Sequence, residues 1–232
     1  MARGSAAIAE ARRLAHPPFL AVSSSVGARL LSLVGDDAAL DERVELLVAV
    51  ATEQGFPHWR AEGTIFRGWV KVKNGDLTGG ISLLRSGSAA YRAAGAGLWM
   101  PHYIAFMAGA SEIEGQIEEA ASLLDDALQI VGRTGERWFA AELNRHKGQA
   151  LLRQGHSEAA EELYCKALRI AQEQEAKLWE LRAATSLAQL RRHQGRPTEA
   201  RDLLAPVYGW FTEGFDTPDL KEARALIETL DA

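Results

Sequence analysis

The stretch GHSEAAEELYCKALRIAQEQEAKLWELRAATSLAQLRRHQG, residues 155–195, is one complete copy of a unit that recurs along the chain. A glycine returns every 40 residues, and an aromatic residue keeps the same interval. The glycines are Gly35, Gly75, Gly115, Gly155 and Gly195, and the aromatic residues are Phe19, Trp59, Trp99, Phe139 and Trp179. Internal repetition at this period is typical of a solenoid, in which each unit buries its apolar face on its neighbours.

The spacing of small and large residues within the unit indicates which kind of repeat this is. In the fourth copy the four diagnostic positions are Gly148, Ala160, Tyr164 and Ala167. Small residues let two helices approach closely, and the large residue between them fills the adjoining groove. This small–small–large–small order is the tetratricopeptide (TPR) pattern, in a unit about six residues longer than the usual one. HEAT-like repeats share the period and are the alternative.

We therefore expect an all-α fold, a right-handed TPR-like α-solenoid of about five 40-residue helix pairs that forms a single domain over residues 1–232. The expected divisions are a partial repeat at 1–16, full repeats at 17–56, 57–96, 97–136, 137–176 and 177–216, and a capping helix at 217–232.

Two stretches depart from the regular pattern. The second repeat alternates polar and apolar residues at 70–73 and carries Gly79, Gly80 and Gly87 in its second helix. Because each glycine within a helix lowers its stability by roughly 0.5–1 kcal/mol, we expect a marginal, mobile repeat, with a hinge as the alternative. Pro206 is expected to interrupt the second helix of the fifth repeat.

The N-terminal segment matches a second helix without the first helix of its pair. One side of Ile8, Ala11 and Leu14 is therefore expected to lack cover. Such a stripe marks an association site, so we expect either fraying over residues 1–16 or self-association through this end. The same feature predicts that the chain is, or once was, part of a longer repeat protein.

Composition and motifs argue against most other classes of protein. A net charge of −5 disfavours a general nucleic-acid binder. Cys165 is the only cysteine, and the longest apolar run, 46–51, is far too short to span a bilayer. No glycine is followed by lysine, which excludes a Walker A loop, and the six histidines form no HExxH motif. We expect a cytoplasmic protein that is not an enzyme and has no cofactor or metal.

The remaining candidate is the inner groove, which the first helix of each repeat lines in TPR proteins. Its side chains become basic and amide-rich toward the C-terminus, and regularly spaced arginines suit forked recognition of carboxylates or phosphates. The predicted partner-binding residues are Glu62, Trp69, His102, Glu142, Arg145, Gln149, Arg182, Gln189 and Arg192.

Four segments also carry a resemblance to a known family. They are 53–59, 135–152, 178–195 and above all 203–223, LLAPVYGWFTEGFDTPDLKEA. The chain resembles the C-terminal, MalT-like TPR region of bacterial regulators that join a class III adenylate/guanylate cyclase domain to a STAND-type ATPase. The resemblance implies a tail that senses ligands or partners and restrains the ATPase, without catalytic residues.

Two functions follow as hypotheses. The first is a non-catalytic interaction module of a signalling or transcription regulator. Its partner is a protein or peptide segment, and an acidic segment is one candidate. The second is a metabolite sensor that holds its ligand near Trp69, His102 and Arg145. A nucleic-acid-binding α-solenoid is disfavoured by the acidic balance.

Overall fold

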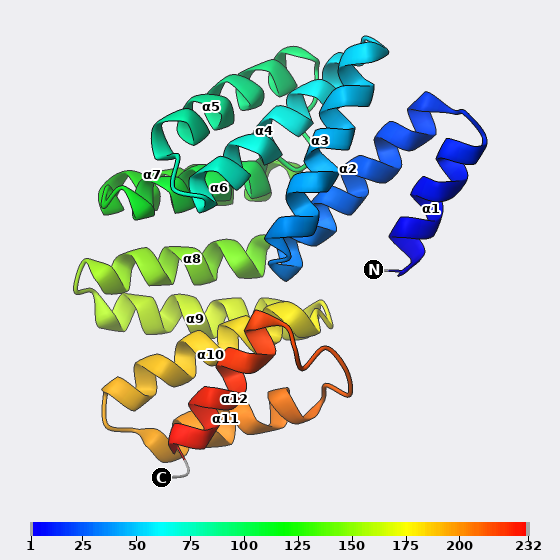
Figure 1. Cartoon of the computed structure of the whole chain (residues 1–232). Helices are drawn as coiled ribbons and strands as arrows, with labels where there is room; N and C mark the ends of the chain where they lie inside the picture. Colours follow the sequence, from blue (N-terminus) through cyan, green and yellow to red (C-terminus); the bar gives the residue numbers. More distant parts are fainter. Residues whose placement is uncertain (1, 231–232) are drawn as a thin grey trace. The chain divides into compact units, whose positions relative to one another are not determined.

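The structure is a computed structural model that describes residues 2–230, with side chains from residue 6 onward, and every regular element within that range is an α-helix (Figure 1). The helices are α1 Ala2–Arg13, α2 Pro17–Val34, α3 Asp37–Glu53, α4 Pro57–Lys73, α5 Leu77–Ala93, α6 Met100–Ile113, α7 Ile117–Thr134, α8 Ala140–Arg153, α9 Ser157–Glu173, α10 Lys177–His193, α11 Pro197–Gly209 and α12 Pro218–Leu230. The expected helical fold is confirmed, whereas the exact repeat boundaries stay a prediction.

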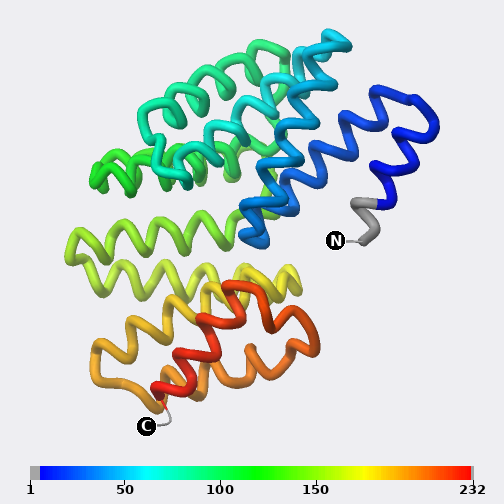
Figure 2. Tube along the Cα trace, viewed as in Figure 1, coloured from blue at the N-terminus to red at the C-terminus, as the bar shows by residue number. Residues whose placement is uncertain are grey.

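The chain divides into two compact units, unit 1 over Met1–Ala110 and unit 2 over Ser111–Ala232. Consecutive helices pack against each other from α1 to α5 in unit 1 and from α7 to α12 in unit 2, and Figure 2 traces the path of the chain through them. In unit 1, α4 contacts α5, α3 and α2. In unit 2, α10 contacts α8, α9, α11 and α12. The first helix of one repeat therefore touches both helices of the repeat before it.

Left-handed turns separate the helices at an interval of 20 residues, from residue 15 to residue 195. Glycine, which adopts positive φ without steric cost, occupies these positions except at Ala15 and Glu175, where φ is 46° and 52°. The 40-residue glycine interval read from the sequence is therefore every second turn of a regular helix–turn–helix series.

The second repeat is closely packed, and the marginal stability and mobility expected of it stay predictions. Both α4 and α5 are continuous 17-residue helices. A Cβ atom on Gly80 would lie 2.7 Å from the carbonyl oxygen of Gly68, and one on Gly87 would lie 2.9 Å from the backbone nitrogen of Ile65. Glycine at these positions lets the two backbones approach, which offsets its weak helix propensity.

Two expectations change. Helix α11 continues through Pro206 instead of ending there. Ile8 and Ala11 are 6% and 0% exposed, because α1 packs against α2, whereas Leu14 is 55% exposed. The uncovered stripe expected on the N-terminal helix is thus reduced to its last residue.

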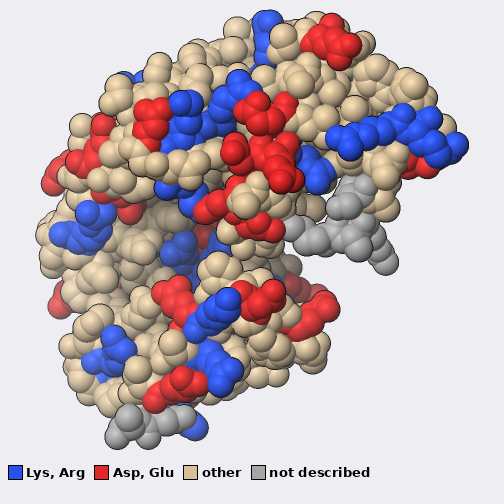
Figure 3. All heavy atoms as spheres, viewed as in Figure 1, with Lys and Arg blue, Asp and Glu red and all other residues tan. Residues whose placement is uncertain are grey.

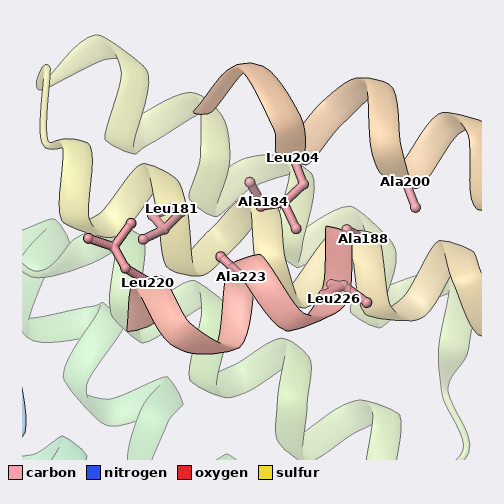
Figure 4. Packing of buried hydrophobic residues seen from close by; sticks show 8 residues of the cluster. All are labelled: Leu181, Ala184, Ala188, Ala200, Leu204, Leu220, Ala223 and Leu226. Carbon is pink, nitrogen blue, oxygen red and sulfur yellow. The ribbon is translucent and has the colours of Figure 1, made fainter. Parts of the chain in front are cut away.

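At the other end, α12 covers the apolar side of α10 and α11 as expected of a cap. Figure 4 shows side chains from the three helices pointing toward one another. The cluster consists of Leu181, Ala184, Ala188, Ala200, Leu204, Leu220, Ala223 and Leu226. Lys221, Arg224 and Glu228 of α12 remain exposed.

Helix α2 is the one described helix whose length and hydropathy would suffice for a membrane span, but a third of it is buried inside unit 1. Core helices of soluble proteins and signal sequences meet the same criterion, so composition alone does not make α2 a membrane segment.

Candidate functional site

The nine sequence-predicted residues fall into two groups. Glu62, Trp69 and His102 lie in unit 1, and the other six lie on α8 and α10 of unit 2. Glu62, His102 and Glu142 are each 1% exposed, so these three side chains belong to the interior. The remaining six are partly or fully exposed.

In unit 1, Glu62 of α4 is the centre of a buried hydrogen-bonded network. Its carboxylate accepts hydrogen bonds from Ser25 Oγ at 2.7 Å and from Tyr103 Oη at 2.7 Å, and it forms an ion pair with Arg29. Burial, together with the neighbouring Glu62 carboxylate, raises the pKa of Tyr103, which keeps this phenol a proton donor. The Trp99 ring covers the Arg29 guanidinium at 4.0 Å.

Trp69 and His102 pack against the same aromatic ring. The Trp69 ring stacks on Phe106 with centroids 4.8 Å apart and planes 6° from parallel. The His102 ring lies 4.5 Å from Phe106. Both side chains therefore contribute to packing between α4 and α6, and Trp69 keeps part of its surface exposed.

In unit 2, Glu142 of α8 occupies the same repeat position as Glu62, two 40-residue periods later. Arg145 donates to its two oxygens at 2.8 and 3.1 Å, and Arg182 of α10 donates to it at 3.1 Å. Arg182 also donates to both oxygens of Asp219, on α12, at 2.6 and 2.9 Å. The network thus links α8, α10 and α12.

Electrostatics fixes the charge states in this network. Burial alone would raise the pKa of Glu142, but Arg145, with a smaller contribution from Arg182, lowers it to about 2. Burial and then the Arg145 guanidinium lower the pKa of His146 to about 3. Glu142 is therefore ionised and His146 neutral at physiological pH.

A groove of about 210 Å³ lies over this network, bounded by α8, α10 and α12. We call it the unit 2 groove. It is lined by Arg145, Gln149, Leu181, Arg182, Thr185, Ser186, Gln189, Asp219 and Glu222. Four of the nine predicted residues, Arg145, Gln149, Arg182 and Gln189, meet here. Arg192 lies one helical turn beyond Gln189 and donates to Thr229 at 3.0 Å.

The groove is less basic than the sequence suggests. Both arginines are engaged in ion pairs, and Asp219 and Glu222 add two carboxylates to the rim. Gln189 donates to Glu222 at 2.8 Å, and Gln149 accepts from Arg145 at 3.3 Å. Figure 3 shows basic and acidic side chains interspersed over the visible face of the molecule.

Five residues that line the groove are not among the nine predicted ones, namely Leu181, Thr185, Ser186, Asp219 and Glu222. The 40-residue register contains a signal for one of them, because Glu222 stands one period after Arg182. The capping helix therefore continues the series of first helices, and its side chains occupy the corresponding positions. Ser186 carries no comparable signal in the sequence.

A larger cavity of about 550 Å³ lies between α4 and α5, and Arg60 is the one charged residue in its lining. Alanine and glycine form much of its wall. The hydroxyls of Thr64 and Ser86 donate to backbone carbonyls of their own helices. Ligand sites combine apolar walls with a few placed polar groups, which favours the unit 2 groove despite its smaller volume.

Across residues 2–230, no three His, Cys, Asp or Glu side chains come together in a way that could hold a metal ion. The exposed Cys165 lies on α9, outside the unit 2 groove.

Comparison with known proteins gives the fold. By sequence, no family model and no curated protein matches the chain. Among solved structures, a Podosopora anserina kinesin light chain-like protein with nearly identical TPR-like repeats is 21% identical, with a TM-score of 0.55 over 92% of this chain and 97% of that one. BtubC (BKLC) from P. vanneervenii is 18% identical, with a TM-score of 0.55 over 99% and 87%. These likenesses establish a TPR-like helical-repeat fold for this chain.

Proposed function

We propose that the chain is a non-catalytic, partner-binding module and that the unit 2 groove binds an extended peptide segment. Support comes from the fold, because stacked helical repeats present extended binding surfaces. It also comes from the convergence of Arg145, Gln149, Arg182 and Gln189 on one groove.

The observation that carries the proposal is the set of hydrogen-bonding side chains that line the groove. The amides of Gln149 and Gln189 keep part of their surface exposed there. A few placed polar groups of this kind orient a ligand and give specificity. Thr185 lines the groove as well, with its hydroxyl oxygen buried. Ser186 beside it lines the same groove.

The amides of Gln149 and Gln189 suggest what the ligand offers. A glutamine amide both donates and accepts hydrogen bonds, as does each peptide unit of an extended chain. Recognition through amides and hydroxyls would suit a neutral polar segment as well as an acidic one. The acidic partner suggested by the sequence stays a prediction, and the pairing of both arginines weakens it.

We further propose that this module is the sensor or partner-binding part of a bacterial signalling or transcription regulator, cytoplasmic in location, for which the support is the resemblance in sequence described above. The metabolite-sensor alternative has less support, because His102 is 1% exposed and Trp69 stacks on Phe106.

The test is selection of binders from a displayed random-peptide library, followed by affinity measurement on two variants. Ser186→Trp fills the groove, and Arg169→Trp places the same ring on an exposed position of α9. We expect peptides that bind wild type and Arg169→Trp equally and bind Ser186→Trp at least about tenfold more weakly. Equal affinity for all three proteins would contradict the proposal.

The variants spare the arginines for a structural reason. Replacing both Arg145 and Arg182 by glutamate would place two further carboxylates beside Glu142, which is buried and depends on them. Loss of binding in that double variant would report a damaged fold rather than a binding site.

A further inference from the structure

The distribution of polar and apolar residues in helix α2 is the opposite of that in an ordinary surface helix. Its exposed residues are all apolar, namely Pro18, Phe19, Val22, Val26 and Leu30. Its buried residues include polar ones, since Ser24, Ser25 and Arg29 are between 0% and 8% exposed. A surface helix normally shows the opposite distribution, with its polar side facing water.

The exposed residues form one continuous stripe. Phe19, Val22, Val26 and Leu30 follow each other at spacings of three, four and four, which places them on one face of a helix. They are 49%, 39%, 47% and 51% exposed. We call these four residues the α2 stripe. Contiguous apolar surface of this kind on a soluble protein marks an interaction site.

The repeat register shows that this face of a first helix normally packs against another helix. Leu190 of α10 stands at the repeat position of Leu30 and is 3% exposed. It belongs to a cluster with Ala160 and Tyr164 of α9, against which Leu151 and Leu152 of α8 pack. The α2 stripe is therefore shaped to receive a helix.

We propose that the α2 stripe is a homodimer interface, in which α2 of one copy packs against α2 of a second copy across a two-fold axis. This surface is separate from the unit 2 groove. The charge distribution favours a second copy as the occupant. Arg29 is the only charged residue of α2, and it is buried in its ion pair with Glu62. Two such faces do not repel each other, and a two-fold contact brings identical surfaces together.

The same observation disfavours a lipid surface. Anionic membranes attract exposed lysine and arginine, and α2 exposes neither. Ser25 and Arg29 bind the carboxylate of Glu62 on α4, which holds α2 against unit 1. Insertion of α2 into a bilayer would leave these buried polar groups without partners.

The size of the α2 stripe sets the affinity that we expect for the dimer. Stable protein interfaces bury about 800 Å² on each partner, and a stripe on a single helix covers less than that. We therefore expect a reversible dimer, whose average mass rises with protein concentration.

Sedimentation equilibrium of the whole chain over roughly a thousandfold concentration range tests the proposal. Wild type should approach the dimer mass. Val22→Glu/Val26→Glu should weaken dimerisation by at least about tenfold, because it places four carboxylates in the contact. Leu98→Glu, at an exposed leucine outside the stripe, should not change it. Far-UV circular dichroism should be the same for all three proteins.

Charge complementation makes the test specific for contact between two α2 helices. Val22→Lys/Val26→Lys should also be monomeric, and an equimolar mixture with the Glu variant should recover the dimer. A wild type that stays monomeric throughout, or a mixture that fails to associate, would overturn the proposal. So would a wild-type monomer that binds phosphatidylcholine vesicles through the stripe.

Discussion

Glu62 and Glu142 occupy the same repeat position in the two units, are equally buried, and are stabilised in different ways. Glu62 takes its cation from the preceding first helix, as Arg29 of α2. Glu142 takes one cation from its own helix, Arg145, and another from the following one, Arg182. The helix that supplies the cation decides whether the nearby surface is apolar or polar. In unit 1 the single charge of α2 turns inward and an apolar face is left outside, whereas in unit 2 the arginines line an open polar groove.

The largest expected effect comes from removing these cations one at a time. Arg29→Met leaves the Glu62 carboxylate buried with only hydroxyl donors, and should lower the free energy of unfolding by about 3–5 kcal/mol. Arg145→Met should cost about half as much, since Arg182 still pairs with Glu142. Urea denaturation at neutral pH gives both values. Equal losses would show that the two carboxylates do not depend on different numbers of cations.

A second comparison uses the equivalent leucines. Leu190→Ala removes a buried side chain from the cluster between α8, α9 and α10 and should cost about 2–4 kcal/mol. Leu30→Ala, at the same repeat position in α2, should change the free energy of unfolding by less than about 0.5 kcal/mol at low protein concentration. A large loss for Leu30→Ala in the monomer would mean that the α2 stripe is covered within the chain.

A smaller effect is the pH dependence of the free energy of unfolding that His146 and Glu142 give to unit 2. His146 binds a proton below pH 6.5 in the unfolded chain, whereas in the folded chain its pKa is about 3. The free energy of unfolding should therefore fall as the pH drops from 6.5 to about 3. Glu142 adds a loss in the same direction from about pH 4.5 down to about pH 2, because its folded pKa is lowered.

His146→Gln should flatten the dependence between pH 6.5 and pH 4.5 by about 1–2 kcal/mol, a range that allows for the partial exposure of the ring. His156→Gln, at an exposed turn position, is the matched control and should keep the wild-type slope. Thermal denaturation at several pH values provides the measurement. An identical slope for the two variants would refute the assignment.

The sequence predicts the fold well because the backbone conformation of the repeat restricts which residue types can occupy certain positions. The left-handed turns favour glycine, and the helix crossings require small residues. Both restrictions recur at a fixed interval, so they can be recognised in a single sequence. The glycines of the second repeat meet such a requirement too. Propensity counts Gly80 and Gly87 as helix breakers, whereas the approach of α4 to α5 requires them.

The candidate site was predicted only in part, because periodicity places a residue on a helix face without naming its neighbours. The pattern assigns Glu62 and Glu142 to the groove, but these carboxylates are bonded to side chains 33 to 41 residues away, namely Arg29, Tyr103 and Arg182. The reversed distribution of polar and apolar residues in α2 follows from the same pairing. Ser25 and Arg29 face inward because Glu62 is there to receive them.

The most direct test of the account is hydrogen exchange, measured by mass spectrometry, with and without a peptide selected on the wild-type chain. The account predicts slower exchange in α8, α10 and α12, whose side chains line the unit 2 groove, and unchanged exchange in α9 and α11. Slower exchange confined to unit 1, or to α9 and α11, would contradict it.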